Sequence, residues 1–130
     1  MTTTVMIVDD QRATRLGLAL MIGKADDLRV IAQAENGQDA LDQLAEIERR
    51  RTLRPNVVLM DVRMPVLNGI DATAAITRKH PGVKVLVLTT YDQDDYAFGA
   101  LGAGASGFLL KDTRTTDLHQ ALRAVAAGDA

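Results

Sequence analysis

The 130-residue chain contains no cysteine and no tryptophan, and it has only two tyrosines and two phenylalanines. Without cysteine there is neither a disulfide framework nor thiolate chemistry, so we expect a cytoplasmic protein. The shortage of aromatic rings removes the platforms on which nucleic-acid bases stack. A net charge of −2 and a pI of about 5.6 give no electrostatic basis for direct nucleic-acid binding either.

Long hydrophobic runs are also missing. No stretch approaches the roughly 20 apolar residues that span a bilayer, and the N-terminus lacks a signal-peptide pattern. Hydrophobic residues make up 47% and charged residues 25% of the chain, as in an ordinary folded domain. We therefore expect one domain over residues 1–130 with a single core and no membrane association.

Short apolar runs alternate with segments of helical periodicity. Strands are predicted over residues 5–8, 28–34, 57–60, 83–88 and 107–110, the second of them partly alternating like an edge strand. Helices are predicted over residues 12–24, 36–47, 68–79 and 92–101, and a last helix that Thr115 or Thr116 caps is predicted to end at Gly128. Strict alternation of this kind predicts an α/β domain, (βα) repeated five times, with a parallel sheet covered by helices on both faces.

Three features outside the strand ends have plain structural interpretations. The helix over residues 92–101 is weakened at its end by glycines, each costing about 1 kcal/mol relative to alanine, so we expect it to be the least firmly held. Residues 48–55 are rich in arginine and are interpreted as a solvated loop. His80 and His119 fall on helix surfaces by their spacing and are interpreted as solvated.

Four of the five predicted strands run directly into polar residues. These are Asp9 and Asp10, Asp61, Thr89 and Thr90, and Lys111. The carboxyl ends of parallel strands lie on one side of a sheet, where ligands bind in α/β folds. A single aspartate or lysine in such a place is usually a cap or a solvated charge, but the joint pattern is far more specific.

The chemistry of this edge is set by its three carboxylates. Two carboxylates about 4 Å apart repel by roughly 4 kcal/mol at an effective dielectric near 20, so the cluster calls for a divalent cation. Oxygen ligands without cysteine or histidine favour Mg²⁺ or Mn²⁺ over Zn²⁺, and such a cation usually serves a phosphoryl group. Lys111 would offset the charge of that group and Thr89 would donate a hydrogen bond to it. Asp61, in the centre, is the best candidate for a nucleophile that forms an acyl phosphate.

These residues carry a family resemblance over essentially the whole chain. The motifs resemble those of a two-component response regulator receiver domain: the Asp9-Asp10 pair, Asp61 followed by Met64-Pro65 and Gly69, Thr89, and residues 107–111. The resemblance implies a flavodoxin-like (βα)5 fold with strand order 2-1-3-4-5. It implies a signalling switch rather than an enzyme, one that catalyses only its own aspartyl phosphorylation and dephosphorylation.

The resemblance also assigns metal and phosphoryl ligands. Asp61 would accept a phosphoryl group from the phosphohistidine of a sensor histidine kinase. Asp10, Asp61 and the backbone carbonyl of Arg63 would bind Mg²⁺ directly, and Asp9 would act through a metal-bound water. Two residues depart from the usual pattern and are expected to alter the lifetime of the phosphoryl group: Arg63, which could reach over the site, and Thr90, whose bulk would narrow the access of water.

The resemblance also implies a conformational change on phosphorylation. Thr89 would move to a phosphoryl oxygen, Lys111 would pair with the phosphoryl group, and Phe108 would turn inward. From the residues alone, Phe108 is interpreted as packed in the core. Homodimers are expected through the first and last helices or through the face formed by residues 92–101, 107–110 and the last helix.

Residues 88–91, 103–112 and 126–129 resemble the NarL/FixJ subfamily, whose members usually carry a C-terminal LuxR-type helix-turn-helix. Transcription regulation would then act through an output domain absent from this chain, and DNA would be bound only there. We expect an excised receiver fragment. The alternative is a single-domain receiver that acts through protein partners or as a phosphorelay shuttle.

Three alternative classes of protein agree less well with the sequence. A haloacid dehalogenase-type phosphatase needs a second aspartate two residues after its nucleophile, where this chain has Arg63 after Asp61 and Arg12 after Asp10. A flavodoxin-like FMN carrier needs a Ser/Thr-rich loop after its first strand, which residues 11–13 do not supply. A degenerate receiver that works unphosphorylated conflicts with the complete set of acidic, hydroxyl and lysine positions.

Overall fold

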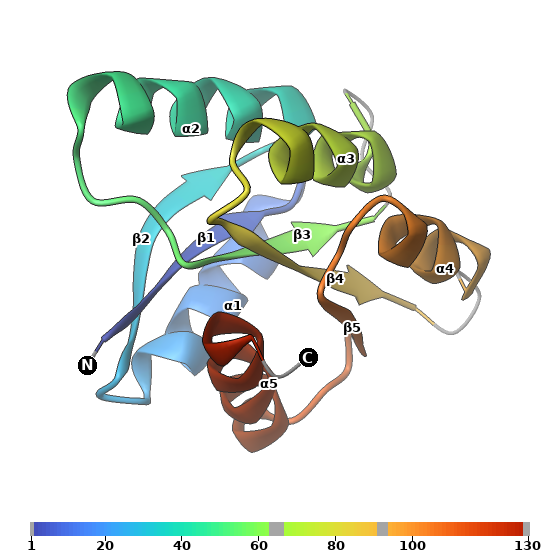
Figure 1. Ribbon diagram of the computed structural model, residues 1–130. Coiled ribbons are helices and arrows are strands. Elements are labelled where there is room, and N and C mark those ends of the chain that lie inside the picture. The colour runs from blue at the N-terminus through green and yellow to red at the C-terminus, as the bar shows by residue number, and fades with distance from the viewer. Residues whose placement is uncertain (1, 63–66, 91–93, 129–130) are drawn as a thin grey trace.

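A five-stranded parallel sheet in the order β2-β1-β3-β4-β5 forms the centre of the molecule (Figure 1). The structure is a computed structural model that describes residues 2–62, 67–90 and 94–128. The strands are β1 (Thr3–Val8), β2 (Leu28–Ala34), β3 (Val57–Asp61), β4 (Lys84–Thr89) and β5 (Gly107–Leu110). The predicted alternation and strand order are confirmed, and β2 is an edge strand as expected.

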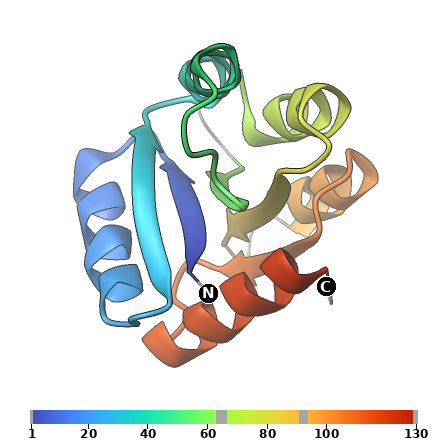
Figure 2. The same cartoon turned by 60° about the vertical axis from the view of Figure 1, so that its left-hand side comes forward.

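Helices cover both faces of the sheet (Figures 1 and 2). They are α1 (Arg12–Gly23), α2 (Gly37–Arg50), α3 (Gly69–Lys79), α4 (Asp94–Gly102) and α5 (Thr115–Ala127). Helices α1 and α5 pack on one face through Ile22 and Leu122, whereas α2, α3 and α4 pack on the other through Leu44, Ile76 and Ala100. None of the helices in the described ranges is long and apolar enough to cross a bilayer.

The central strands are buried on both sides, which explains their continuous apolar runs. In β1, Met6 packs with the helices of one face and Ile7 with those of the other, and both are fully buried. In β3, Met60 and Leu59 divide in the same way. Since alternate residues of a strand point to opposite faces, a strand between two helical layers has no polar side to show.

Two asparagine caps fix where α2 and α3 begin. The Asn36 side chain accepts a hydrogen bond from the Asp39 amide at 2.8 Å, and Asn68 accepts one from the Asp71 amide at 2.9 Å. Each cap of this kind contributes about 1 kcal/mol to helix stability. The second cap sets the start of α3 close to the end of β3.

One predicted helix end and one predicted helix cap were wrong. Helix α2 continues through Glu48 to Arg50, so the first part of the supposed solvated loop is helical and stops where Arg51 takes a left-handed conformation with φ of 52°. Helix α5 begins at Thr115, after Arg114, without a side-chain cap, so neither threonine caps it.

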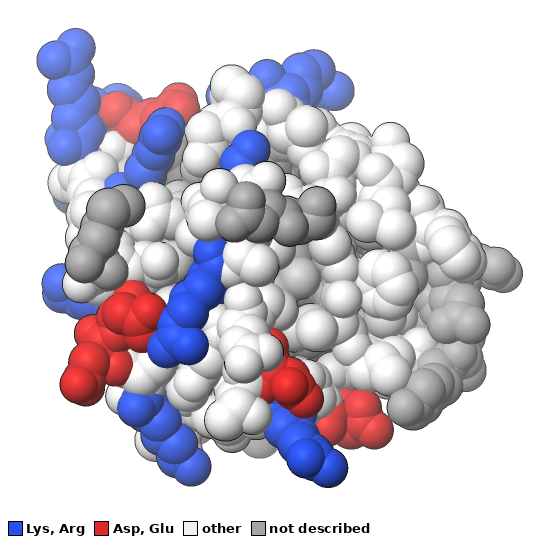
Figure 3. Space-filling model, turned by 60° about the horizontal axis from the view of Figure 1, so that its bottom comes forward, with Lys and Arg blue, Asp and Glu red and all other residues white. Residues whose placement is uncertain are grey.

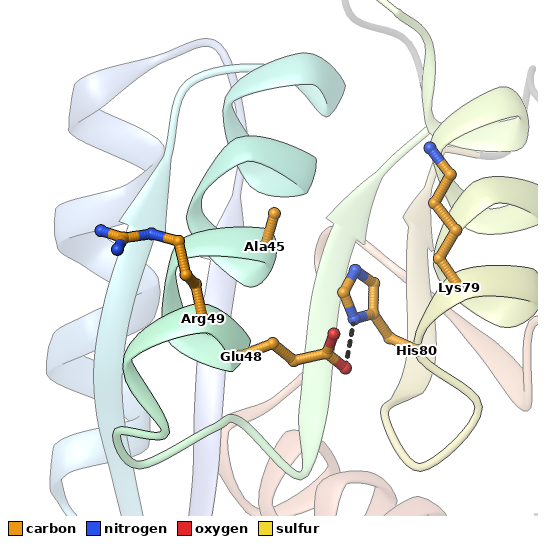
Figure 4. A pocket seen from close by; sticks show the side chains of 5 residues that line it. All are labelled: Ala45, Glu48, Arg49, Lys79 and His80. Carbon is orange, nitrogen blue, oxygen red and sulfur yellow. Dashed lines mark hydrogen bonds and ion pairs between the residues drawn. The ribbon is translucent and has the colours of Figure 1, made fainter.

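The interpretation of both histidines as solvated was also wrong. His80 is 5% exposed and its Nδ1 lies 2.9 Å from Glu48 Oε1, while His119 is 9% exposed and its Nε2 lies 2.7 Å from the Met21 carbonyl oxygen. Figure 4 shows Glu48 and His80 pointing toward each other, with Arg49 and Lys79 turned away. These residues line an open pocket of about 440 Å³ at the ends of α2 and α3. Partners from distant elements, rather than solvent, satisfy these rings.

Candidate active site

The ends of β1, β3 and β4 are brought together by the register of the sheet. Val8 pairs with Met60 and Asp61 pairs with Leu88, so the polar residues that end these strands lie at one edge. Asp9 follows β1 directly, Asp61 is the last residue of β3, and Thr89 is the last residue of β4. The predicted convergence of these residues is confirmed.

Three carboxylates form an acidic cluster at this edge. One side-chain oxygen from each of Asp9, Asp10 and Asp61 lies within 4.8 Å of the others. Asp9 and Asp61 are buried, and Asp10 is exposed. Asp9 Oδ1 accepts a hydrogen bond from the Gln11 amide at 2.9 Å, but Asp9 Oδ2 is buried without a hydrogen-bond partner. An orphaned carboxylate oxygen beside two more carboxylates fits a hard, oxygen-seeking cation.

Burial and the neighbouring carboxylates both disfavour the charged form of Asp9. Burial is the main cause that raises the pKa of the Asp9 carboxyl above its ordinary value, and the charges of Asp61 and Asp10 raise it further. The hydrogen bond from the Gln11 amide and the charge of Lys111 act in the opposite direction. A divalent cation at this place would relieve the same repulsion.

Lys111 supplies the positive charge of the site. Its Nζ lies 3.0 Å from Asp61 Oδ1 and 3.9 Å from Asp9 Oδ2, so it pairs with Asp61 and is too far from Asp9 to donate a hydrogen bond. The Lys111 amide donates to the Thr89 carbonyl oxygen at 2.8 Å, which fixes the start of the lysine to the end of β4. The lysine side chain is one-third exposed and can therefore meet an incoming group.

Two threonines follow the same edge. The buried Thr89 hydroxyl donates to the Thr90 carbonyl oxygen at 3.3 Å, a long hydrogen bond. Thr90 lines a cavity of about 170 Å³ together with Leu110, Lys111 and Asp112. A small space therefore adjoins the lysine on the side of β4 and β5.

Two other predicted site residues have different outcomes. Phe108 is 45% exposed, so the interpretation from the residues alone, that it is packed in the core, was wrong. Arg63, with its expected carbonyl ligand, lies outside the described residues, as do Met64 and Pro65 of the matching motif.

Two further residues contribute to the site: Gly69, which belongs to the matching motif, and Arg15, which the sequence analysis did not single out. A Cβ on Gly69 would come 2.8 Å from the Val62 Cα and would also clash with the Asp61 carbonyl oxygen, so α3 approaches the end of β3 as only glycine allows. Arg15 Nη1 donates to the Asp9 carbonyl oxygen at 2.6 Å. The family motif includes Gly69, but nothing in the sequence pattern indicated a role for Arg15.

Comparison with known families decides between the interpretations. Residues 5–123 match the model of the response regulator receiver domain. The chain belongs to this family. Its receiver domain is 44% identical over 124 residues to the transcriptional regulatory protein LnrK of Bacillus subtilis, a match that covers 95% of this chain and 54% of LnrK. It is 39% identical over 124 residues to the response regulator GacA of Pseudomonas aeruginosa, covering 95% of this chain and 55% of GacA.

Solved receiver structures agree in fold. The signal receiver domain of the putative response regulator NarL from Mycobacterium tuberculosis superposes with a TM-score of 0.85 at 30% identity, covering 98% of both chains. A LuxR-family two-component response regulator from Aurantimonas superposes with a TM-score of 0.86 at 30% identity, covering 98% of this receiver and 87% of that chain. The receiver spans about half the length of the curated relatives it matches.

Proposed function

We propose that this receiver domain is a phosphorylation-dependent switch in which Asp61 accepts a phosphoryl group from a sensor histidine kinase. The observation that carries the proposal is the pairing of Asp61 Oδ1 with Lys111 Nζ at 3.0 Å inside a cluster of three carboxylates. A nucleophilic carboxylate that sits beside an ammonium and a set of hard oxygen ligands is suited to phosphoryl transfer.

In the transfer step, an Asp61 carboxylate oxygen attacks phosphorus. A new P–O bond forms as the P–N bond to the donor imidazole breaks, and the imidazole leaves with the electron pair and takes up a proton. Asp9, Asp10 and Asp61, with the Arg63 carbonyl as a further proposed ligand, would hold Mg²⁺ or Mn²⁺, which neutralises charge on the phosphoryl oxygens. Lys111 exchanges its pairing with Asp61 for a phosphoryl oxygen.

The conformational response begins at Thr89. Its hydroxyl leaves the long hydrogen bond to the Thr90 carbonyl for a phosphoryl oxygen, because a hydrogen bond to a charged acceptor is stronger. Phe108, now 45% exposed, turns inward in the phosphorylated state. The phosphoryl group shifts the balance between the two states through the contacts that it makes in only one of them. Arg63 and Thr90 modulate how long it persists.

The output of the switch lies outside this chain. The relatives named above are about twice as long, so we infer an attached DNA-binding output domain that regulates transcription in the cytoplasm. On the face shown in Figure 3, acidic side chains lie among the lysines and arginines rather than leaving one continuous basic patch, in keeping with DNA binding elsewhere. A single-domain receiver or phosphorelay shuttle remains the alternative.

Two apolar surfaces are candidates for homodimer formation. On α1, Leu16 and Leu20 are 48% and 73% exposed, and on the α4–β5 side Phe98 and Phe108 are 69% and 45% exposed. Both surfaces were expected as dimer contacts. The second includes the proposed switch residue, so phosphorylation would alter it directly.

The proposal is tested by intact-mass spectrometry after incubation with acetyl phosphate and Mg²⁺. We expect one added phosphoryl group on the parent chain, none on Asp61→Asn, and none when EDTA replaces Mg²⁺. Asp26→Asn is the matched control because Asp26 is exposed and distant in sequence from the cluster, and it should be phosphorylated like the parent. An adduct on Asp61→Asn, or none on the parent, would overturn the assignment.

A further inference from the structure

Asp10 is the least supported member of the acidic cluster. Its side chain is exposed and makes no hydrogen bond or ion pair with any part of the chain that the structure describes. Asp9, in contrast, is buried and accepts a hydrogen bond from the Gln11 amide. The position of the Asp10 carboxylate therefore depends on the backbone that carries it.

The backbone at this point is held by Arg15. Arg15 Nη1 donates to the Asp9 carbonyl oxygen at 2.6 Å. That oxygen belongs to the planar peptide unit that joins Asp9 to Asp10, so holding it also holds the Asp10 Cα, from which the side chain leaves the backbone. A neutral acceptor bonded to a charged donor makes one of the stronger protein hydrogen bonds.

The arginine itself is anchored at the start of α1. The Arg15 amide donates to the Gln11 carbonyl oxygen at 3.1 Å, and the Gln11 amide donates to Asp9 Oδ1 at 2.9 Å. Together with the guanidinium contact, these bonds tie the first turn of α1 to both the side chain and the carbonyl of Asp9. The Arg15 side chain is only partly exposed, which limits the conformations open to it.

We propose that Arg15 is a positioning residue that holds the Asp9–Asp10 turn in the geometry that binds the divalent cation. The inference rests on the proposed function, because the cation is the one that phosphoryl transfer at Asp61 requires. A positive charge near a cation site weakens binding, whereas an ordered ligand strengthens it. If Arg15 acted only as a nearby positive charge, its loss would strengthen Mg²⁺ binding. If Arg15 positions the turn, its loss weakens Mg²⁺ binding.

The test is a Mg²⁺ titration of the unphosphorylated protein. Calorimetry measures the binding, and the NMR resonances of the Asp9 and Asp10 amides monitor the site. We expect Arg15→Met to weaken Mg²⁺ binding about fivefold, less than the full strength of this charge-assisted hydrogen bond, because the turn keeps the bond from the Gln11 amide to Asp9 Oδ1. Arg15→Lys keeps the charge and a donor and should recover part of the loss. Arg12→Met is the matched control: it removes the same charge from the same turn, where Arg12 is exposed and has no described partner, and should bind Mg²⁺ as tightly as the parent or slightly more tightly.

Phosphorylation by acetyl phosphate gives a second readout. In Arg15→Met, the Mg²⁺ concentration for half-maximal rate should rise about fivefold while the rate at saturating Mg²⁺ returns toward that of the parent. Unchanged or tighter Mg²⁺ binding by Arg15→Met would overturn the inference, as would equal behaviour of Arg15→Met and Arg12→Met. If Arg15→Met does not fold, Arg15→Gln and Arg15→Lys are compared instead. The inference would be overturned if both of these variants bound Mg²⁺ as tightly as the parent. A parent chain that binds no Mg²⁺ would instead refute the proposed function.

Discussion

Gly69 determines how closely α3 approaches the nucleophile candidate. A side chain at this position meets the Asp61 carbonyl oxygen and the Val62 Cα, and both belong to backbone that the sheet holds in place. The Gly69 amide also donates to the Val62 carbonyl oxygen at 2.9 Å. The cost of a larger residue here therefore falls on the end of β3 and not on a flexible side chain.

We predict that Gly69→Ala lowers the free energy of unfolding by about 2 kcal/mol, within the usual range for overpacking. The same displacement of Asp61 should slow phosphorylation by acetyl phosphate at least tenfold. Urea unfolding and intact-mass time courses measure the two effects. Gly17→Ala is the control, because a Cβ at Gly17 meets nothing within 4 Å and alanine favours a helix. Equal stability of Gly69→Ala and the parent would contradict the prediction.

At the level of single residues, the sequence predicted the acidic cluster but misjudged both histidines. The sequence identified Asp9, Asp61 and Lys111 because each directly follows an apolar run. A parallel sheet then places the ends of these runs at one edge. His80 could not, because its burial depends on Glu48, which lies 32 residues away on another helix. Periodicity within one helix carries no information about such a partner.

Among the elements, α5 is held to the connection between α1 and β2 by an ion pair. Arg123 donates two hydrogen bonds to the Asp27 carboxylate, at 2.7 and 2.8 Å. These bonds are the main cause that holds the pKa of Asp27 below its ordinary value of 3.8. The Asp27 carbonyl oxygen also accepts the Thr3 amide at 2.8 Å, so one residue joins the helix to the start of β1.

This ion pair predicts a definite pH dependence. A carboxyl whose pKa is lowered by folding stabilises the folded state above its unfolded pKa, and loses that contribution as the pH falls through the folded pKa. Asp27→Asn should therefore be less stable than the parent at pH 7. The difference should begin to shrink near pH 3.8 and vanish below the folded pKa. Urea unfolding across pH measures it, with Asp26→Asn as control; a difference independent of pH would contradict the ion-pair explanation.

The elements themselves were largely predictable, and their ends less so. The asparagine caps of α2 and α3 are local signals and were read correctly as helix starts. The end of α2 was misplaced because residues 48–50 are polar and were interpreted as a loop. The helix nevertheless continues through them with their side chains exposed, and Glu46 forms ion pairs with both Arg49 and Arg50. Polarity alone does not separate a loop from an exposed helical turn. The expectation that α4 is the least firmly held helix stays a prediction.

For the whole molecule, the strand order was predicted through the family resemblance and not through local patterns. Alternating strands and helices required a parallel sheet, but nothing in the periodicity places β1 between β2 and β3. That placement follows from pairing between residues far apart in sequence, such as Val8 with Met60. The same long-range pairing brings Asp9 and Asp61 together, but their presence at one edge could be predicted from a parallel sheet alone, without the strand order.

A cation that binds only the folded chain should stabilise the entire domain. At a Mg²⁺ concentration ten times its dissociation constant, linkage predicts a gain of about 1.4 kcal/mol in the free energy of unfolding. This corresponds to a rise of about 5 °C in Tm for a domain of this size. Thermal unfolding in Mg²⁺ and in EDTA, at matched ionic strength, measures the gain. Asp10→Asn should lose most of it, and an equal rise in that variant would place the binding elsewhere.

Residues drawn from positions 9 to 111 meet at one edge of the sheet, and this has a consequence for protein synthesis. A ribosome makes β1 and β3 well before it reaches Lys111, so a growing chain holds Asp9 and Asp61 without the ammonium that pairs with them. Such a chain also lacks β5 and the edge of the sheet that orders β4. The paired arrangement of carboxylates and ammonium can therefore form only in a nearly complete domain, and incomplete translation products lack it.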